Sequence, residues 1–304
     1  MRLGIYGLGR MGANMARRLS RGGIEVVAHN RSTAPIDVLV ATESHITAAY
    51  SLAELIAELP TPRVIWLMLP SGEITEEAIT QILPMLAEGD LLIDGGNSFY
   101  KDTIARAARV QKGGVHYMDV GTSGGVWGLN NGYSLMFGGS DEAAALIIPA
   151  IKVLAPSEKH GWGHVGPVGS GHFTKMVHNG IEYGMMQALA EGLAMLRAKQ
   201  EFDLDLAQIT ELWRDGSVVQ SWLLDLTAEA LATQGQGLEH IAPVVADSGE
   251  GRWTAKEAID LGVAAPVMTL ALQMRFASQD VEGYGNRLLS LMRNAFGGHA
   301  IVSK

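Results

Sequence analysis

Five reactive side chains crowd one ten-residue stretch of the sequence, KMVHNGIEYG. An amine, an imidazole, an amide, a carboxylate and a phenol come from Lys175, His178, Asn179, Glu182 and Tyr183. Side chains of these types transfer protons and bind polar substrates. The stretch is therefore a candidate active site, provided that the fold turns these side chains into a cleft.

Helical geometry would gather the five side chains into one polar stripe. Successive residues of a helix advance by about 100°, so the stripe spans about 140° of arc, with Lys175 and Glu182 two turns apart on one line. The opposite side would carry Val177, Ile181, Met185 and Ala188. An amphipathic helix with a solvated polar face is the alternative. Because the turns that follow are apolar nearly all round, we expect the polar stripe to face a cleft.

A glycine motif near the N-terminus predicts a dinucleotide site. Gly7, Gly9 and Gly12 (GLGRMG) follow the apolar run RLGIY and open a helical pattern. The first glycine permits the turn, the second lets a pyrophosphate approach the backbone, and the third allows close packing of helix and strand. Amides at the helix start would hold the phosphates. The other positions expected at the cofactor are Leu8, Arg10 and Met11. A glycine-rich turn without a ligand is the alternative.

The end of the next strand pattern, IEVVAHN, bears on the choice of cofactor. An NAD site usually has a carboxylate there, whereas this chain has Asn30, Arg31 and Ser32. Neutral and cationic donors suit a 2′-phosphate. We therefore expect NADP to be favoured, with NAD possible. If Arg31 is an ordinary solvated loop residue, the choice stays open.

Two polar loops follow later strand patterns. They span residues 94–98 (DGGNS) and 121–125 (GTSGG), and three glycines in GPVGSGH precede Lys175. In open α/β sheets, ligands bind at the carboxyl ends of the strands. Either loop alone could be a simple turn, but both together with the polar stripe favour a site.

The positioning elements fall into two parts. From residue 2 to about 150, strand and helix patterns alternate, which predicts a Rossmann-type, doubly wound sheet that is parallel at least in its first strands. Residues 173–199 predict a buried helix of about 27 residues, and further helices follow. We expect a dinucleotide-binding domain over residues 1–165. A helical substrate and oligomerisation domain would follow over 166–304, joined by the long helix.

Composition limits the partners. The net charge is −9, no run of basic residues is long, and cysteine is absent. Nucleic acid is therefore not expected as a partner. No apolar stretch approaches the roughly 18 residues of a membrane span, and MRLGIYGLGRMG lacks the pattern of a secretory signal. The sequence predicts a cytoplasmic protein that binds no membrane.

These motifs resemble the short-chain, decarboxylating 6-phosphogluconate dehydrogenases of the β-hydroxyacid dehydrogenase superfamily. The resemblance covers essentially all 304 residues. It rests on GLGRMG, DGGNS, GTSGG, GPVGSGHFTKMVHNGIEYG, GEGRWT, Arg275 in QMRFASQ, and RNAFGGH. The Lys-x-x-His-Asn-x-x-Glu-Tyr run is the most specific of them.

The resemblance implies oxidation of 6-phosphogluconate at C3, loss of CO2 and formation of ribulose 5-phosphate. Lys175 would be the base and later the acid, and Glu182 would protonate C1 of the enediol. Carboxylate and hydroxyl contacts would come from Asn97, Ser123, Gly124, Gly125, His178 and Asn179. Phosphate contacts would come from Tyr183, Arg252, Arg275, Arg293 and His299. Asn97 would also touch the cofactor. The last two phosphate residues would come from another subunit of a homodimer or homotetramer.

The chemistry makes opposite demands on the two catalytic groups. Free lysine titrates near 10.4, so a neutral Lys175 needs burial or neighbouring cations. Glu182 must instead keep its proton, and no metal is required. Arg252 replaces a lysine common in the family. Val126 and Trp127 replace an acidic pair of many relatives, so we expect a different lip of the substrate site.

Two other functions compete with this interpretation. A hydroxyacid dehydrogenase similar to 3-hydroxyisobutyrate dehydrogenase would stop after hydride transfer, and it would not need Glu182. A non-catalytic NADP-binding scaffold would not need Lys175. The sequence leaves open a role in the pentose phosphate pathway or in gluconate utilisation.

Overall fold

The computed structural model describes residues 1–302, which form a sheet flanked by helices and then a series of helices. This confirms the predicted fold class. The strands are β1 Arg2–Tyr6, β2 Glu25–His29, β3 Ile46–Ala49, β4 Val64–Leu67, β5 Leu91–Asp94, β6 His116–Ser123, β7 Ser134–Gly138 and β8 Trp162–Gly166. The helices flanking the sheet are α1 Arg10–Arg21, α2 Ala34–Thr42, α3 Leu52–Ala57, α4 Glu73–Ile82, α5 Tyr100–Val110, α6 Gly128–Asn131 and α7 Asp141–Leu154. The later helices are α8 Ser170–Ala198, α9 Leu206–Trp213, α10 Trp222–Gln234, α11 Glu250–Asp260, α12 Pro266–Gln279 and α13 Tyr284–Gly297. Short 3-10 turns are η1 Leu83–Met85, η2 Gln111–Gly113, η3 Gly125–Trp127 and η4 Gln200–Phe202.

The sheet has the order β3-β2-β1-β4-β5-β6-β7-β8. Neighbouring strands from β3 to β6 are parallel, as predicted, whereas β7 is antiparallel to β6 and β8 is parallel to β7. The carboxyl ends of β1, β4, β5 and β6 therefore lie at one edge. The loops after these strands carry the predicted cofactor and substrate residues, so that edge is where a ligand would be expected.

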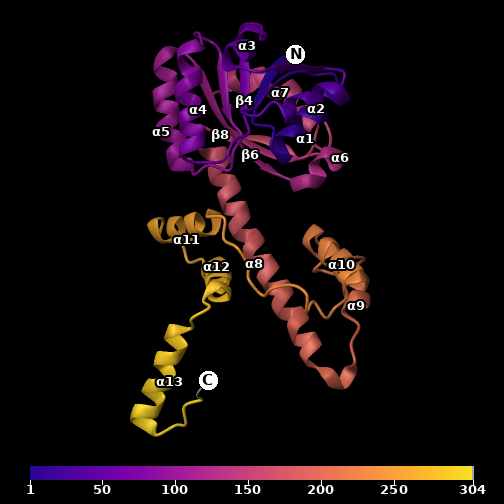
Figure 1. Ribbon diagram of the computed structural model, residues 1–304, viewed down its shortest axis with the longest axis vertical. Helices are drawn as coiled ribbons and strands as arrows, with labels where there is room; N and C mark the ends of the chain where they lie inside the picture. The colour runs from indigo at the N-terminus through magenta and orange to yellow at the C-terminus, as the bar shows by residue number, and fades with distance from the viewer. Residues whose placement is uncertain (303–304) are drawn as a thin grey trace. The chain divides into compact units, whose positions relative to one another are not determined.

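Helices cover both faces of the sheet, as Figure 1 shows for α4 and α5 and for α1 and α2. One apolar cluster includes residues of β1, α1, α2 and α7, and a second includes residues of β2, β4, α3, α4 and α5. Every residue of β4 and β5 is buried. Central strands covered on both faces are mostly apolar, which explains the run VIWL and the first three residues of LLID.

Two compact units make up the chain, Met1–His178 and Asn179–Lys304, and α8 carries residues of both. In the second unit α9 packs with α10 and α11 packs with α12, and Tyr183, Ala271 and Leu272 form a small buried cluster. Across residues 1–302, no helix combines the length and the apolar character that spanning a membrane would take.

The prediction that α8 is a buried helix is wrong for its second half. Lys175 and Met176 in the first turns are buried, but in the second half Met185 is 43% exposed, Met186 41% and Met195 74%. A helix that is apolar nearly all round needs cover on every side, and the described chain supplies only part of that cover.

Candidate active site

The three glycines of the N-terminal motif meet different surroundings. Gly7 has φ +105°, and a Cβ there would overlap with the carbonyl oxygen of Met68. A Cβ on Gly12 would overlap with the carbonyl oxygen of Gly7, whereas a Cβ on Gly9 would meet no atom within 4 Å. Gly9 is also the residue before α1, and no side chain caps that helix. The loop therefore leaves room beside backbone N–H groups that can bind phosphate.

Asn30 connects this loop to the end of β2. Its Oδ1 accepts a hydrogen bond from the Leu8 backbone N–H at 3.0 Å, and its Nδ2 donates to Ser32 Oγ at 2.9 Å. The side chains of Arg31 and Ser32 are exposed. Burial raises the pKa of Tyr6, and the positive charge of Arg31 opposes this rise. Tyr6 at the end of β1 is the register partner of His29 at the end of β2, so Arg31 follows the strand that lies beside the glycine loop. A cation is thus placed close to the glycine loop.

Lys175 is buried, at 8% exposure, where α8 crosses β6. A Cβ on Gly121 would overlap with Lys175 Cβ, and a Cβ on Gly171 would lie 2.7 Å from the carbonyl oxygens of Asp119 and Met136. Only glycine at these positions lets the start of α8 lie directly on the sheet. Its direct contact with the sheet removes the first turns of α8 from solvent.

A chain of three polar side chains begins at the buried amine. Lys175 Nζ lies 3.4 Å from His178 Nδ1, and His178 Nε2 lies 3.4 Å from Ser123 Oγ. Ser123 ends β6, next to Gly124 at φ +129° and Gly125 at φ +51°. Three predicted site residues from two segments are therefore in contact. This arrangement can pass or hold a proton at the carboxyl edge of the sheet.

The loop after β5 presents Asn97 to solvent. The buried Asp94 carboxylate accepts hydrogen bonds from the Gly96 N–H at 3.1 Å and from Ser98 Oγ at 3.2 Å. These bonds fold the loop around Asp94, and Asn97 is exposed. Asn97 is thus placed at the same edge as Ser123.

The second unit holds a separate cationic cluster around Tyr183, which is 6% exposed. Arg275 Cζ lies 3.5 Å from the centre of the Tyr183 ring, and Tyr183 Oη lies 3.2 Å from Ser248 Oγ. Arg252 pairs with Asp247, and its Cζ lies 4.6 Å from the centre of the Phe276 ring. Two guanidinium groups and a phenol beside the start of α11 can bind an anion such as a phosphate.

Ser248 was missed in the sequence. It precedes the quoted motif GEGRWT by one residue, and its Oγ also donates to Glu250 Oε2 at 2.6 Å. A serine directly before a glycine at a helix start was the signal that could have identified it.

The remaining predicted residues lie on α8, on α13 and in the segment that follows α13. Asn179 and Glu182 are half-buried on α8, next along the polar stripe. Arg293 lies on α13, where Leu288, Leu289 and Leu291 are exposed, and His299 follows that helix. Within the polar stripe Lys175 and Tyr183 are buried and the other three side chains are half-buried, so the stripe is less exposed than a fully solvated face.

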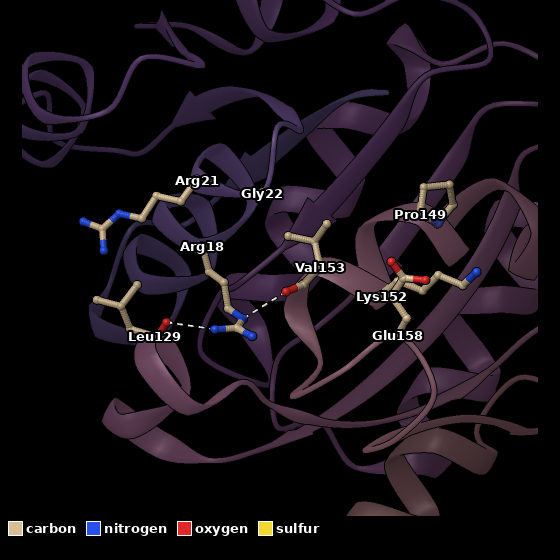
Figure 2. A pocket seen from close by; sticks show the side chains of 8 residues that line it. All are labelled: Arg18, Arg21, Gly22, Leu129, Pro149, Lys152, Val153 and Glu158. Atoms are coloured by element: carbon tan, nitrogen blue, oxygen red, sulfur yellow. Dashed lines mark hydrogen bonds between the residues drawn. The ribbon is translucent and has the colours of Figure 1, made fainter.

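A pocket elsewhere on the first unit lies where α1 is hydrogen-bonded to α6 and α7 (Figure 2). It is lined by Arg18, Arg21, Gly22, Leu129, Pro149, Lys152, Val153 and Glu158. Arg18 donates to the carbonyl oxygens of Val153 at 2.9 Å and Leu129 at 3.1 Å, which joins α1 to the ends of α7 and α6. Arg21 pairs with Glu43. Arg18 and Arg21 lie in the last turn of α1, at the end of that helix away from the glycine loop, so the pocket is not part of the candidate site.

Comparison with known proteins identifies related sequences along the whole chain. The family model described as the NAD binding domain of 6-phosphogluconate dehydrogenase matches residues 2–163. The model described as the 6-phosphogluconate dehydrogenase C-terminal domain matches residues 171–300.

Among residues 1–302, no group of three or more His, Asp or Glu side chains is arranged to hold a metal ion.

Three relatives illustrate the similarity. An NAD(+)-dependent, decarboxylating 6-phosphogluconate dehydrogenase of Haloferax volcanii is 38% identical over 100% of this chain and 99% of its own. An NADP(+)-dependent, decarboxylating enzyme of Bacillus subtilis is 35% identical over 91% of this chain and 61% of its own. The Plasmodium falciparum enzyme, solved in its apo form, with NADP+ and with 6-phosphogluconate, has a TM-score of 0.85 and is 28% identical. It covers 100% of this chain, which spans 66% of that enzyme.

Proposed function

Because the chain belongs to the 6-phosphogluconate dehydrogenase family, we propose that it oxidises and decarboxylates 6-phosphogluconate to ribulose 5-phosphate and CO2. The observation that carries this proposal is the buried Lys175 in contact with His178, which in turn contacts Ser123. NADP or NAD would accept the hydride from C3. Residues 1–165 would bind this dinucleotide, and residues 166–304 would bind the substrate and mediate oligomerisation.

Lys175 would act twice in this reaction. Its neutral amine would take the proton of the 3-hydroxyl as the C3 hydride leaves. The resulting ammonium would then donate to the ketone oxygen while the bond to the carboxylate breaks and CO2 departs. Burial disfavours the charged form of an amine, which suits a lysine that must begin neutral. Because a β-keto acid with such a donor decarboxylates readily, no metal is needed.

Glu182 would complete the reaction by protonating C1 of the enediol. It follows Lys175 by seven residues on the same helix, so the two side chains lie about two turns apart on one side of α8. The sugar acid would be held between them by Asn97, Ser123, Gly124, Gly125, His178 and Asn179. A non-decarboxylating hydroxyacid dehydrogenase has no use for this second proton donor.

The cationic cluster would bind the substrate phosphate. Tyr183 and Arg275 are held against each other, and Arg252 lies on α11, which begins one residue after Gly249. Arg293 and His299 would join them from a second copy of the chain. The exposed leucines of α13 and the exposed second half of α8 support a homodimer or homotetramer, since such apolar surfaces are normally covered.

NADP would be preferred to NAD. The cation of Arg31 near the glycine loop supports this preference, as does the absence of a carboxylate among residues 30–32. The names of the relatives include enzymes for each cofactor, so family membership alone does not decide the choice.

A steady-state assay with 6-phosphogluconate tests the function. Reduced cofactor and CO2 are measured in parallel with NADP and with NAD. We expect both products, with a higher kcat/KM for NADP. NADPH without CO2 would support the hydroxyacid dehydrogenase that stops after hydride transfer. Dinucleotide binding without turnover of any hydroxyacid would support the non-catalytic scaffold.

A further inference from the structure

Two buried carboxylates lie side by side beneath the candidate site. Asp94 ends β5 and Asp119 lies in β6, and the two residues are register partners in the parallel sheet. Both are 0% exposed. Register partners on adjacent strands point to the same face. Burying two neighbouring carboxyl groups costs free energy unless hydrogen bonds stabilise each of them. The partners of Asp94 and Asp119 therefore indicate what each group stabilises in return.

Asp119 binds the start of the helix that carries Lys175. Its Oδ1 accepts the Gly169 N–H at 2.7 Å, and its Oδ2 accepts the His172 N–H at 2.7 Å. Burial raises the pKa of Asp119, and these two N–H groups oppose the rise. A carboxylate at a helix start satisfies N–H groups that have no partner within the helix. Lys175 follows His172 by three residues, about one turn.

Glycines on either side make room for this carboxylate. A Cβ on Gly138 would lie 2.8 Å from Asp119 Oδ1, and a Cβ on Gly171 would lie 3.0 Å from Oδ2. The carboxylate is therefore enclosed by β7 and α8 as well as being bonded to the helix start. Its position, and with it the position of the first turn of α8, is tightly defined.

Asp94 binds the loop that carries Asn97. Besides the Gly96 and Ser98 bonds to Oδ1, its Oδ2 lies 3.4 Å from Arg106 Nη1 and 3.3 Å from Tyr117 Oη. Arg106 comes from α5 and is itself 5% exposed. Asp94 is thus fixed by a buried cation on one side while it shapes the loop on the other.

We propose that Asp94 and Asp119 are a pair of positioning residues. Together they fix the position of the Asn97 loop relative to Lys175. This rests on the proposed function, in which Asn97 and Lys175 act on one substrate. The two anchors sit on adjacent hydrogen-bonded strands, about 4.8 Å apart, so they cannot shift independently. Neither touches the substrate. Their effect on rate comes from geometry, since a misplacement of about 1 Å can cost roughly 100-fold.

The chain offers a matched control in Asp90. It is 1% exposed and accepts two backbone N–H groups, from Arg63 at 2.7 Å and Ala87 at 2.9 Å, as well as an ion pair with Arg63. It precedes β5, at the opposite edge of the sheet from Asn97. Asp90→Asn and Asp119→Asn make the same chemical change to similarly bonded buried groups, but only Asp119 lies under the site.

The test compares Asp119→Asn, Asp90→Asn and the unchanged full-length chain. We measure thermal unfolding, the Kd of NADP, kcat for 6-phosphogluconate, and the deuterium isotope effect on kcat with substrate labelled at C3. Both variants should lower the unfolding temperature. Only Asp119→Asn should lower kcat, by about tenfold or more, and raise the isotope effect, because misplaced reacting groups make hydride transfer rate-limiting. The Kd of NADP should stay within about twofold.

Equal effects of the two variants on kcat and on the isotope effect would overturn the positioning role. If Asp119→Asn does not fold, Asp94→Asn replaces it with the same expected result. If neither folds while Asp90→Asn does, the pair serves folding alone and the proposal fails. An unchanged chain without activity on 6-phosphogluconate would instead overturn the proposed function.

Discussion

Lys175 of α8 and Gly121 of β6 touch so closely that a side chain at position 121 would overlap with Lys175 Cβ. Because Gly121 has no side chain, Lys175 can pack directly against the backbone of β6. The same strand continues to Ser123, which contacts His178, and so one strand supports two residues of the polar stripe.

Gly121→Ala should therefore damage activity more than stability. The added methyl group would push the start of α8 off β6 and move Lys175. We expect kcat to fall by about 100-fold. The free energy of unfolding should fall by about 1–3 kcal/mol, as for other overpacked sites. Gly163→Ala in β8 is the control, because a Cβ there meets no atom within 4 Å. A kcat for Gly121→Ala within twofold of that control would contradict the close seating.

Gly9→Ala should separate cofactor binding from folding. A Cβ on Gly9 meets no atom within 4 Å, so thermal unfolding should be nearly unchanged. The methyl group would instead occupy the space expected for the pyrophosphate. We predict that the Kd of NADP, measured by calorimetry, rises by about tenfold or more. Gly113→Ala is also unobstructed and serves as the control. Unchanged NADP binding in Gly9→Ala would rule out this loop as the phosphate site.

Arg31→Ala tests the choice of cofactor. Removal of the cation should raise the KM for NADP by about 10- to 100-fold, in line with the loss of one charge-assisted contact worth about 1.5–3 kcal/mol. The KM for NAD should change little, since NAD has no 2′-phosphate, and NAD therefore provides the internal control. A mutant that keeps its full preference for NADP would show that Arg31 is a solvated loop residue.

Arg275→Lys tests the phosphate cluster. Lysine keeps the charge but loses the planar group that lies 3.5 Å from the centre of the Tyr183 ring. We expect the KM for 6-phosphogluconate to rise by about tenfold or more, while the Kd of NADP stays constant. Arg197→Lys, on an exposed arginine that pairs with Glu239, is the matched control. Equal KM values for the two variants would place the phosphate elsewhere.

The sequence predicted the strands and helices whose patterns are strong. RLGIY and IEVVAHN correspond to β1 and β2, because strands covered on both faces are largely apolar. It missed β3 and β8. The run ITAA of β3 is short and weakly apolar. β8 lies at the sheet edge, contains Gly163 and Gly166, and has no buried residue. Such edge strands form because the adjacent strand offers unpaired backbone N–H and C=O groups. A local sequence pattern does not show which strand is adjacent.

The polar stripe was predicted from helical spacing, but the contacts that hold it were not. The bonds of Asp119 to Gly169 and His172 could not be predicted from a local pattern, because they join residues 50 and 53 positions apart. Ser248 was missed because its partner Tyr183 lies 65 positions away. The sequence predicted that all of α8 is buried, but its second half is exposed. An apolar composition indicates that a helix surface is covered, but it does not show whether the same chain or another one covers it.

The most direct test of the account measures CO2 and NADPH together from 6-phosphogluconate, with the unchanged chain and with Lys175→Met. Methionine keeps most of the length of the side chain and removes the amine. The account predicts about one CO2 per NADPH for the unchanged chain and a loss of both products by about 1000-fold or more in the variant. NADPH without CO2 from the unchanged chain, or a Lys175→Met rate within tenfold of it, would contradict the account.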